Sequence, residues 1–391
     1  MLERTIAHEL ITAAEEQRPA MFRMRAAIRA GGKAALASGI DNGNDALKAA
    51  ILTPEGQLIT LRVPTAYREA EEIRSGRGEI SYTLGNATFW IGETALRHGG
   101  DDLPIGPTKQ RLIDPRQRAV IGATIVELLH SAGYAADEYL VVIGFAIPNG
   151  EIVRQKGPEG EDRILGVEPE TLAVMGEHLK GAVWKIDRTD ADGNVLAWTI
   201  RVQSLTPQPQ TAGTVIVCTK APTGVTVTTF DEFEVIDIGG GDLQDTHVRT
   251  RPYQMVSRRL GDGTIRIARA LKAKFPRMEL NDVAAQQALI SKRLLVSGRW
   301  KDISKEVQEV INSQGQALVA ATLPQLAQSQ RFVIITGGGV ILLHDLLEER
   351  LQTVNKVRGE DYELINHTVA SLLNAIGVMF GAIYRASARK D

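Results

Sequence analysis

The stretch GIDNGNDALKAAI, residues 39–51, decides the fold of this chain. It opens as a strand, places Asp41 directly after an apolar residue, and then breaks at Gly43 and Asn44. An alternating strand resumes and carries Lys48. Glycine adopts backbone angles that are closed to other residues, and Asx residues are common in tight turns. The stretch therefore predicts two antiparallel strands joined by a sharp turn, with an aspartate at the end of the first strand.

A second stretch, EVIDIGGGDLQD at residues 234–245, repeats the pattern roughly 200 residues later. Both contain an apolar residue, Ile, Asp, any residue and Gly. Glycines at such a turn let backbone N–H groups approach an anion closely. Taken alone, each is also ordinary turn chemistry, and a purely structural turn is the simpler reading of one of them. Two matched turns separated by the length of a domain predict instead that they face each other and hold a phosphate chain between them.

The aspartates of the two turns, Asp41 and Asp237, would repel phosphates unless a divalent cation lay between them. Mg²⁺ prefers carboxylate and phosphate oxygens and keeps several of its waters, so both aspartates are candidate metal partners. Lys48 can add a point charge toward a phosphate. The rest of the candidate set consists of turn residues, namely Gly43, Asn44, Gly239, Gly240, Gly241 and Asp242.

A third glycine cluster follows the apolar strand FVIIT and consists of Gly337, Gly338 and Gly339. Glycines at this place would let a flat heterocycle lie against the backbone. The alternative is a strand-to-helix loop that needs unusual backbone angles.

Strand and helix patterns alternate along the chain. Residues 5–31 read as two short helices, either packed on their own domain or a neighbour, or binding a membrane or partner. A strand meander follows from residue 36, a hairpin and short helix at 79–100, a helix at 116–133 and a buried strand at 139–148. A mainly helical region covers 264–328, and a last buried strand precedes helices that run to the C-terminus. This order predicts an α/β protein with mixed sheets.

Composition limits the function classes. At 391 residues the chain exceeds one ordinary core, so roughly two to three domains are expected. The net charge of −2 gives no electrostatic reason for direct nucleic-acid binding. A single cysteine, Cys218, permits no intrachain disulfide and fits a reducing compartment. No apolar run reaches the length of a membrane helix, and the N-terminus has no secretory pattern. We therefore expect a cytoplasmic protein.

The order of these motifs resembles the actin superfamily of ATPases, and within it the bacterial actin-like ParM and Alp proteins that segregate plasmids. Five segments carry the resemblance: IDNGNDALK (40–48), FWIGETALRHG (89–99), IDIGGGDLQD (236–245), ITGGGVILL (335–343) and LLNAIGVMF (372–380). The resemblance covers residues 36–391 and leaves 1–35 uncovered. It implies a ribonuclease H-like fold of two domains, with domain I at 36–232 and 358–391 and domain II at 233–357.

The resemblance also implies function. It predicts ATP or ADP with Mg²⁺ in the cleft between the domains, filaments that depend on ATP, and DNA segregation through a DNA-binding adaptor protein. In the segment LTPQPQTAG, Gln208 falls where the family positions the attacking water, and Gln210 is the less expected occupant. A glutamine can orient water but is a poor base, so we expect slow hydrolysis. The predicted catalytic residues are Gln208, Asp41 and Asp237.

One departure from the family affects the second turn, where Asp242, Leu243 and Gln244 replace the frequent Thr-Thr-Asp. Losing a hydroxyl and adding a carboxylate bears on the hydrolysis rate more than on nucleotide binding.

Two rival functions remain at this point: a sugar or acid kinase with the same ATPase core, and a chaperone-like ATPase that never polymerises. We identify neither the catalytic aspartate that a kinase needs nor a following peptide-binding domain. No two histidines are four residues apart, so we expect His8, His98, His130, His178, His247, His344 and His367 to be ordinary surface or core residues.

Overall fold

The computed structural model describes residues 35–53, 57–70, 79–156, 162–220, 231–250, 253–278, 280–296, 299–328, 331–358, 362–364 and 368–388. The helices predicted at residues 5–31 lie outside the described residues.

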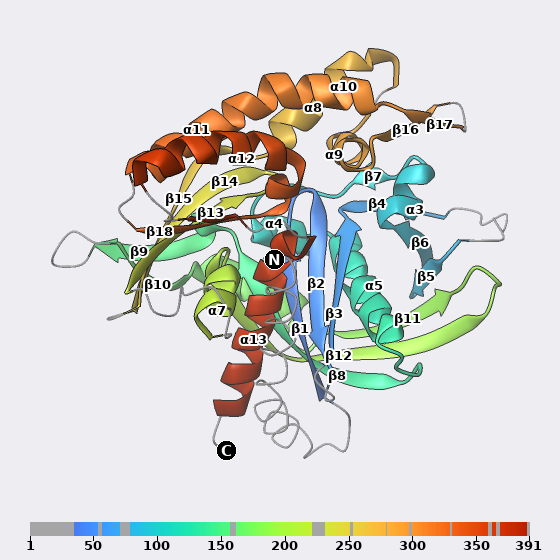
Figure 1. Cartoon of the computed structure of the whole chain (residues 1–391). Helices are drawn as coiled ribbons and strands as arrows, with labels where there is room; N and C mark the ends of the chain where they lie inside the picture. Colours follow the sequence, from blue (N-terminus) through green and yellow to red (C-terminus); the bar gives the residue numbers. More distant parts are fainter. Residues whose placement is uncertain are drawn as a thin grey trace.

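A ten-stranded mixed sheet forms the larger half of the molecule (Figure 1). β1 pairs antiparallel with β2 and parallel with β8, so the first turn joins the second and third strands from one edge of this sheet. The strands are, in spatial order, β3 (Leu58–Pro64), β2 (Ala46–Leu52), β1 (Ala35–Asn42), β8 (Glu138–Ile147), β12 (Val195–Pro209), β11 (Val183–Thr189), β5 (Ser81–Leu84), β6 (Ala87–Ile91), β4 (Ala66–Glu69) and β7 (Asp101–Asp102).

A five-stranded mixed sheet forms the other half. β13 pairs antiparallel with β14 and parallel with β18, so the second turn occupies the same place in this sheet as the first turn does in the larger one. The strands are, in spatial order, β15 (Tyr253–Asp262), β14 (Asp242–Thr250), β13 (Glu232–Ile238), β18 (Phe332–Thr336) and β19 (Tyr362–Leu364).

Two hairpins and the α-helices make up most of the remaining described structure. The hairpins are β9 (Ile152–Lys156) with β10 (Asp162–Val167), and β16 (Arg293–Val296) with β17 (Arg299–Asp302). The helices are α3 (Gly92–Arg97), α4 (Thr108–Ile113), α5 (Pro115–Ser131), α6 (Pro169–His178), α7 (Ala212–Lys220), α8 (Ile265–Lys274), α9 (Asp282–Ser291), α10 (Ser304–Val310), α11 (Gln316–Gln328), α12 (Gly338–Arg358) and α13 (Leu373–Ala388). Among these helices, none combines the length and apolar character that crossing a bilayer requires.

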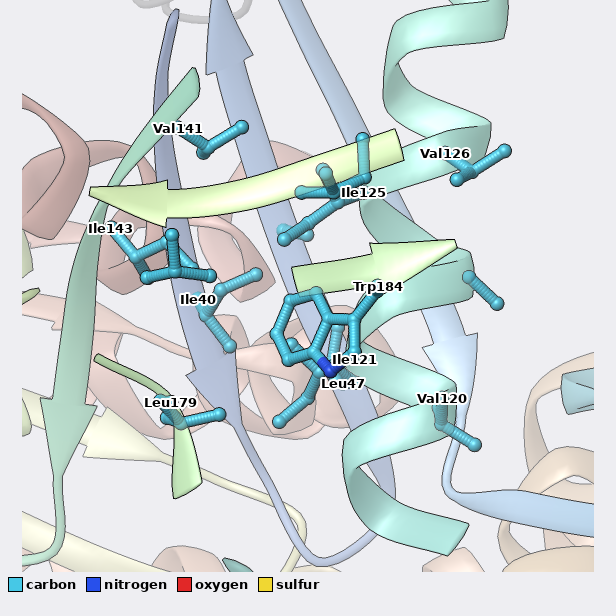
Figure 2. Packing of buried hydrophobic residues seen from close by; sticks show 14 of the residues in the cluster. Ile40, Leu47, Val120, Ile121, Ile125, Val126, Val141, Ile143, Leu179 and Trp184 are labelled. Carbon is cyan, nitrogen blue, oxygen red and sulfur yellow. The ribbon is translucent and has the colours of Figure 1, made fainter. Parts of the chain in front are cut away.

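The helix α5 covers part of one face of the larger sheet. Asp114 caps its first turn by accepting a hydrogen bond from the Arg116 amide at 2.8 Å, and Pro115 occupies the favoured first position. Ile121 and Ile125 on α5 belong to the same buried cluster as Ile40 on β1, and Figure 2 shows this packing. Each fully buried isoleucine contributes about 1.5–3 kcal/mol. The packing of β1 against α5 therefore holds the turn between β1 and β2 in place.

The helix α13 lies against β1 and β8 and beside α7 (Figure 1). Gly39 and Gly144 are cross-strand neighbours. A Cβ atom on either would lie within 1.9 Å of a backbone carbonyl oxygen of α13, Ala375 O for Gly39 and Val378 O for Gly144. The two glycines thus give the helix a flat surface at backbone distance.

The predicted α/β class with mixed sheets is confirmed, as are the hairpin at the first turn and the buried strand β8. The predicted helix at 116–133 is α5. The described residues of 264–328 are mainly helical, as predicted, and include the hairpin of β16 and β17. The division into domains at residues 36–232, 233–357 and 358–391 stays a prediction.

Candidate functional site

The turn between β1 and β2 concentrates buried charge. Lys48 lies opposite Asp41 in the strand register, and its Nζ is 3.7 Å from Asp41 Oδ2 and 3.6 Å from Asp45 Oδ1. Arg62 on β3 donates from Nη2 to Asp45 Oδ2 at 2.9 Å. At Gly43, a Cβ would lie 2.8 Å from the Ala46 carbonyl oxygen, so the turn closes more tightly than a side chain allows.

The protonation of these groups follows from burial and pairing. Burial raises the pKa of Asp41, and the Lys48 ammonium offsets this only in part. Burial also works against ionised Asp45, yet Lys48 and Arg62 outweigh it and lower the pKa of Asp45 to about 2. Burial opposes a charged Lys48, but Asp45 and Asp41 raise its pKa. Lys48 therefore stays protonated between two carboxylates.

The turn between β13 and β14 carries the second aspartate. Asp237 Oδ2 accepts a hydrogen bond from Asn374 Nδ2 of α13 at 3.1 Å. Burial raises the pKa of Asp237 to about 7, and the nearby carboxylates Asp242 and Asp41 add to the effect. Gly337, at φ +98°, lies so close that a Cβ there would be 2.3 Å from Asp237 Oδ1.

The two turns face each other and touch. A Cβ on Gly240 would lie 2.6 Å from Asp45 Cγ, and a Cβ on Gly241 would lie 2.6 Å from Asn44 Nδ2. Between them lies a cavity of about 230 Å³ that is open to solvent. Residues from both sheets line it: Asp41, Asn42, Gly43, Asn44, Asp45, Lys48, Gly106, Arg111, Ala146, Pro148, Gln210, Asp237, Gly239, Gly240, Gly241, Asp242, Arg259, Gly337, Gly338, Ala370, Ser371 and Asn374.

Two of the predicted site residues do not line this cavity. Gly339 packs where a Cβ would lie 2.4 Å from Ile238 Cγ2, so it serves the approach of α12 to β13. Gln208 donates from Nε2 to the Val378 carbonyl oxygen of α13 at 3.2 Å. The structure therefore differs from the expectation for Gln208, because its side chain turns toward α13.

Gln210 lines the cavity in its place. The chain bends directly after it at Thr211, whose φ of +72° is rare for a β-branched residue. Gln244 donates from Nε2 to Gln210 Oε1 at 3.1 Å. Asn149 in turn donates to Gln244 Oε1 at 2.5 Å, and Asp242 Oδ2 accepts from Gln244 Nε2 at 2.6 Å. Gln244 thus ties Gln210 and Asn149 of the larger half to the second turn.

Sequence reasoning missed further cavity residues, notably Arg111, Asn42 and Asp45. Asn42 and Asp45 lie within residues 39–51, but no sequence feature distinguishes them from ordinary turn residues. Arg111 comes from α4, and its Nη1 donates to the Asn42 carbonyl oxygen across 69 residues of sequence. Nothing near Arg111 in the sequence marks it.

The residues that line the cavity fit a magnesium ion that takes most of its ligands from phosphate and water. Within the described residues, no group of three or more His, Cys, Asp or Glu side chains forms a cage for a metal. Asp41 and Asp237 nevertheless line the same cavity, and burial raises the pKa of each. A divalent cation would relieve that penalty, and Mg²⁺ is usually bound by one or two carboxylates together with substrate phosphates.

The lowered pKa of Asp45 predicts a pH dependence of stability. Because the pKa falls from 3.8 to about 2 on folding, Asp45 stabilises the folded protein above about pH 4, and this contribution is lost as the pH falls through about 2. The stabilisation is about 2 kcal/mol. Urea unfolding of wild type and Asp45→Asn should differ most at pH 6, and the difference should shrink at pH 3. A difference that stayed constant with pH would contradict the assignment.

Solved structures of similar fold come from archaea and bacteria. The complex of Ta0583, an archaeal actin homologue, with ADP is 16% identical, with a TM-score of 0.59 over 89% of this chain and 99% of that one. Bacillus thuringiensis ParM with AMPPNP is 13% identical, with a TM-score of 0.56 over 90% and 99% of the two chains. A non-polymerisable quadruple mutant of pCBH ParM is 14% identical, with a TM-score of 0.59 over 89% and 99%. No protein-family model and no curated protein sequence matches the chain. At these identities the likeness concerns the fold.

Proposed function

Because this chain has the ParM-like fold of the actin superfamily, we propose that it is an ATPase that binds ATP or ADP between its two sheets and assembles into filaments. One observation carries the proposal: two matched turns from different sheets meet around one cavity, with Gly240 against Asp45 and Gly241 against Asn44. Solved structures of the same fold are described as complexes with ADP, ATP and AMPPNP, which supports a nucleotide as the ligand.

The residues of the two turns would hold the phosphates. The glycines at 43 and 239–241 allow close backbone approach, and Lys48 supplies a fixed positive charge. Asp41 and Asp237 would hold Mg²⁺ directly or through water, and the ion would supply charge neutralisation at the phosphates. Gly337 and Gly338 would lie against the adenosine.

We assign the orientation of the attacking water to Gln210 in place of Gln208. Gln210 lines the cavity, and its Oε1 is held by Gln244, whereas Gln208 contacts α13. An amide orients water by hydrogen bonding but removes no proton, so hydrolysis by in-line attack would rest on positioning and be slow.

Filament assembly would follow from the same geometry. A nucleotide held by both turns makes the angle between the two halves depend on the terminal phosphate, and that angle biases contacts between subunits. One neighbour in fold is described as a non-polymerisable mutant of a ParM protein, which supports self-association as the form of assembly. The proposed cellular role is DNA segregation in the cytoplasm through an adaptor protein, without direct DNA contact. The net charge of −2 agrees with indirect contact.

Light scattering and phosphate release together test the proposal. Purified wild-type protein with ATP and Mg²⁺ should scatter more light than the same protein with ADP or without nucleotide, and should then release phosphate slowly. Gln210→Ala should keep the ATP-dependent rise but lower phosphate release by about tenfold or more. The matched variant Gln208→Ala should release phosphate at nearly the wild-type rate.

Three outcomes would contradict parts of the proposal. ATP turnover that appears only with added small molecules would favour a kinase. Turnover without any rise in scattering would remove filament assembly and leave the ATPase. Loss of turnover in Gln208→Ala with retention in Gln210→Ala would restore the sequence-based assignment.

A further inference from the structure

Arg111 is a buried cation that the turns themselves do not explain. It sits on α4, only 3% of its surface is exposed, and it lines the cavity beside the turn between β1 and β2. Its Nη1 donates to the Asn42 carbonyl oxygen. Its Nε is buried and has no hydrogen-bond partner in the described structure. A buried guanidinium with an unused donor is costly unless a further partner joins it.

The carboxylates near Arg111 do not neutralise it. Glu151 exerts the larger electrostatic attraction on Arg111, followed by Asp41. Both oxygens of Glu151 already accept hydrogen bonds, from the Thr108 amide at 2.7 Å and from Thr171 Oγ1 at 2.7 Å. Burial lowers the pKa of Arg111 to about 10, and the attraction of the two carboxylates does not reverse this. Additional negative charge beside Arg111 would therefore be favourable.

A second unused donor lies beside Arg111. Asn42 is 3% exposed and lines the same cavity. Its Oδ1 accepts from Gln117 Nε2 at 2.8 Å, and its Nδ2 has no partner within the described residues. Two side chains that each hold a buried unused donor, one of them charged, thus line the cavity, as does Gln210. Phosphate oxygens are acceptors that suit such donors, and an arginine fork binds them with defined geometry.

We infer that Arg111, assisted by Asn42, binds the terminal phosphate of a nucleoside triphosphate and so makes the site prefer triphosphate over diphosphate. Arg111 touches the turn between β1 and β2, and Glu151, which attracts it, lies in the same short 3-10 helix (Asn149–Glu151) as Asn149. Asn149 binds Gln244, which also binds Gln210. The glycines proposed for adenosine come from the other sheet. This inference rests on the proposed function, since it assigns one end of the same cavity. It gives the larger half of the molecule its own contact with the phosphate that hydrolysis removes.

Affinities for nucleotides test the inference without turnover. We would measure binding of a non-hydrolysable ATP analogue and of ADP, each with Mg²⁺, by calorimetry on wild type, Arg111→Gln and Arg111→Lys. Arg111→Gln should weaken the triphosphate analogue by about tenfold or more and ADP by about twofold or less. Arg111→Lys should recover part of the loss, because it restores charge without the fork. Arg116→Gln, which removes a half-exposed arginine paired with Asp114 at 2.7 Å, is the matched control.

Thermal unfolding with inorganic tripolyphosphate and pyrophosphate tests the phosphate subsite independently of nucleotide binding. Tripolyphosphate should raise the melting temperature of wild type more than pyrophosphate does, and Arg111→Gln should abolish the difference. If wild type binds no nucleotide but shows this difference, the nucleotide proposal fails and the phosphate subsite stands. Equal weakening of both nucleotides in Arg111→Gln, unchanged affinity for both, or no tripolyphosphate effect in wild type would overturn the inference and leave Arg111 as a brace for the turn.

Discussion

Replacing Lys48 by methionine is expected to abolish nucleotide binding and to destabilise the protein by about 3–5 kcal/mol. Lys48 is 8% exposed and lies within 4 Å of both Asp41 and Asp45. Methionine keeps the length of the side chain but removes the charge, so two buried carboxylates would face each other with Arg62 paired to only one of them. The same carboxylates would then repel the phosphates of an incoming nucleotide.

The measurement combines urea unfolding with calorimetric titration of ATP. A matched control is Lys272→Met on α8, where the lysine side chain is 43% exposed and pairs with Asp282 at 3.3 Å. An exposed pair of this kind contributes only about 0–1 kcal/mol, so this variant should remain close to wild type in stability and affinity. A Lys48→Met protein that bound ATP normally would exclude the turn between β1 and β2 as a phosphate site.

The sequence predicts the two turns well because their signal is local. Asp41 and Gly43, like Asp237 and Gly239, stand within three residues of the strand end that they terminate, and strand pairing then fixes them. The alternating apolar residues predict the strands, and the glycines predict the turns that end them. The repeated pattern also predicts that the two turns face each other, and the contacts of Gly240 and Gly241 agree with this prediction.

Side-chain direction in β12 is not predictable in the same way. The pairing of β12 with β8 shifts register between Val202 and Ser204, and such a bulge re-aims the residues that follow. The positive φ at Thr211 adds a second change of direction. Gln208 and Gln210 stand two residues apart in the same polar stretch, so their sequence context gives no means of choosing between them.

Long-range contacts set the remaining part of the site. Arg111 reaches Asn42 from a separate helix, and Asn374 reaches Asp237 across 137 residues. Gln244 has partners from three different segments, namely Asn149, Gln210 and Asp242. No periodicity or spacing encodes these distances. The polar contacts that join the two halves therefore become visible only in the folded molecule.

Replacing Gly144 by alanine is expected to lower stability by about 3 kcal/mol and to weaken nucleotide binding at a distance. A Cβ at this position would lie 1.9 Å from the Val378 carbonyl oxygen and 3.0 Å from the Met379 amide nitrogen, both backbone atoms of α13. Backbone atoms of a packed helix cannot turn aside as a side chain can, so α13 must move away from β8. Gly377 of the same helix contacts Gly213 of α7 as closely, with a Cβ position 1.8 Å from the Gly213 oxygen, and this limits where α13 can go.

The displacement should reach the site through Asn374. This residue holds α13 to α7 by accepting from Thr214 Oγ1 at 3.1 Å, and it holds Asp237 by donating at 3.1 Å. Moving α13 stretches both bonds, which removes a hydrogen bond that stabilises ionised Asp237 and alters the candidate magnesium partner. Gly150→Ala is the matched control, because a Cβ there meets nothing within 4 Å and φ is not positive. Urea unfolding and ATP titration should find Gly150→Ala within about 1 kcal/mol of wild type. A Gly144→Ala protein with wild-type stability would show that α13 does not lie at backbone distance from the sheet, and the link from sheet to Asp237 would fail with it.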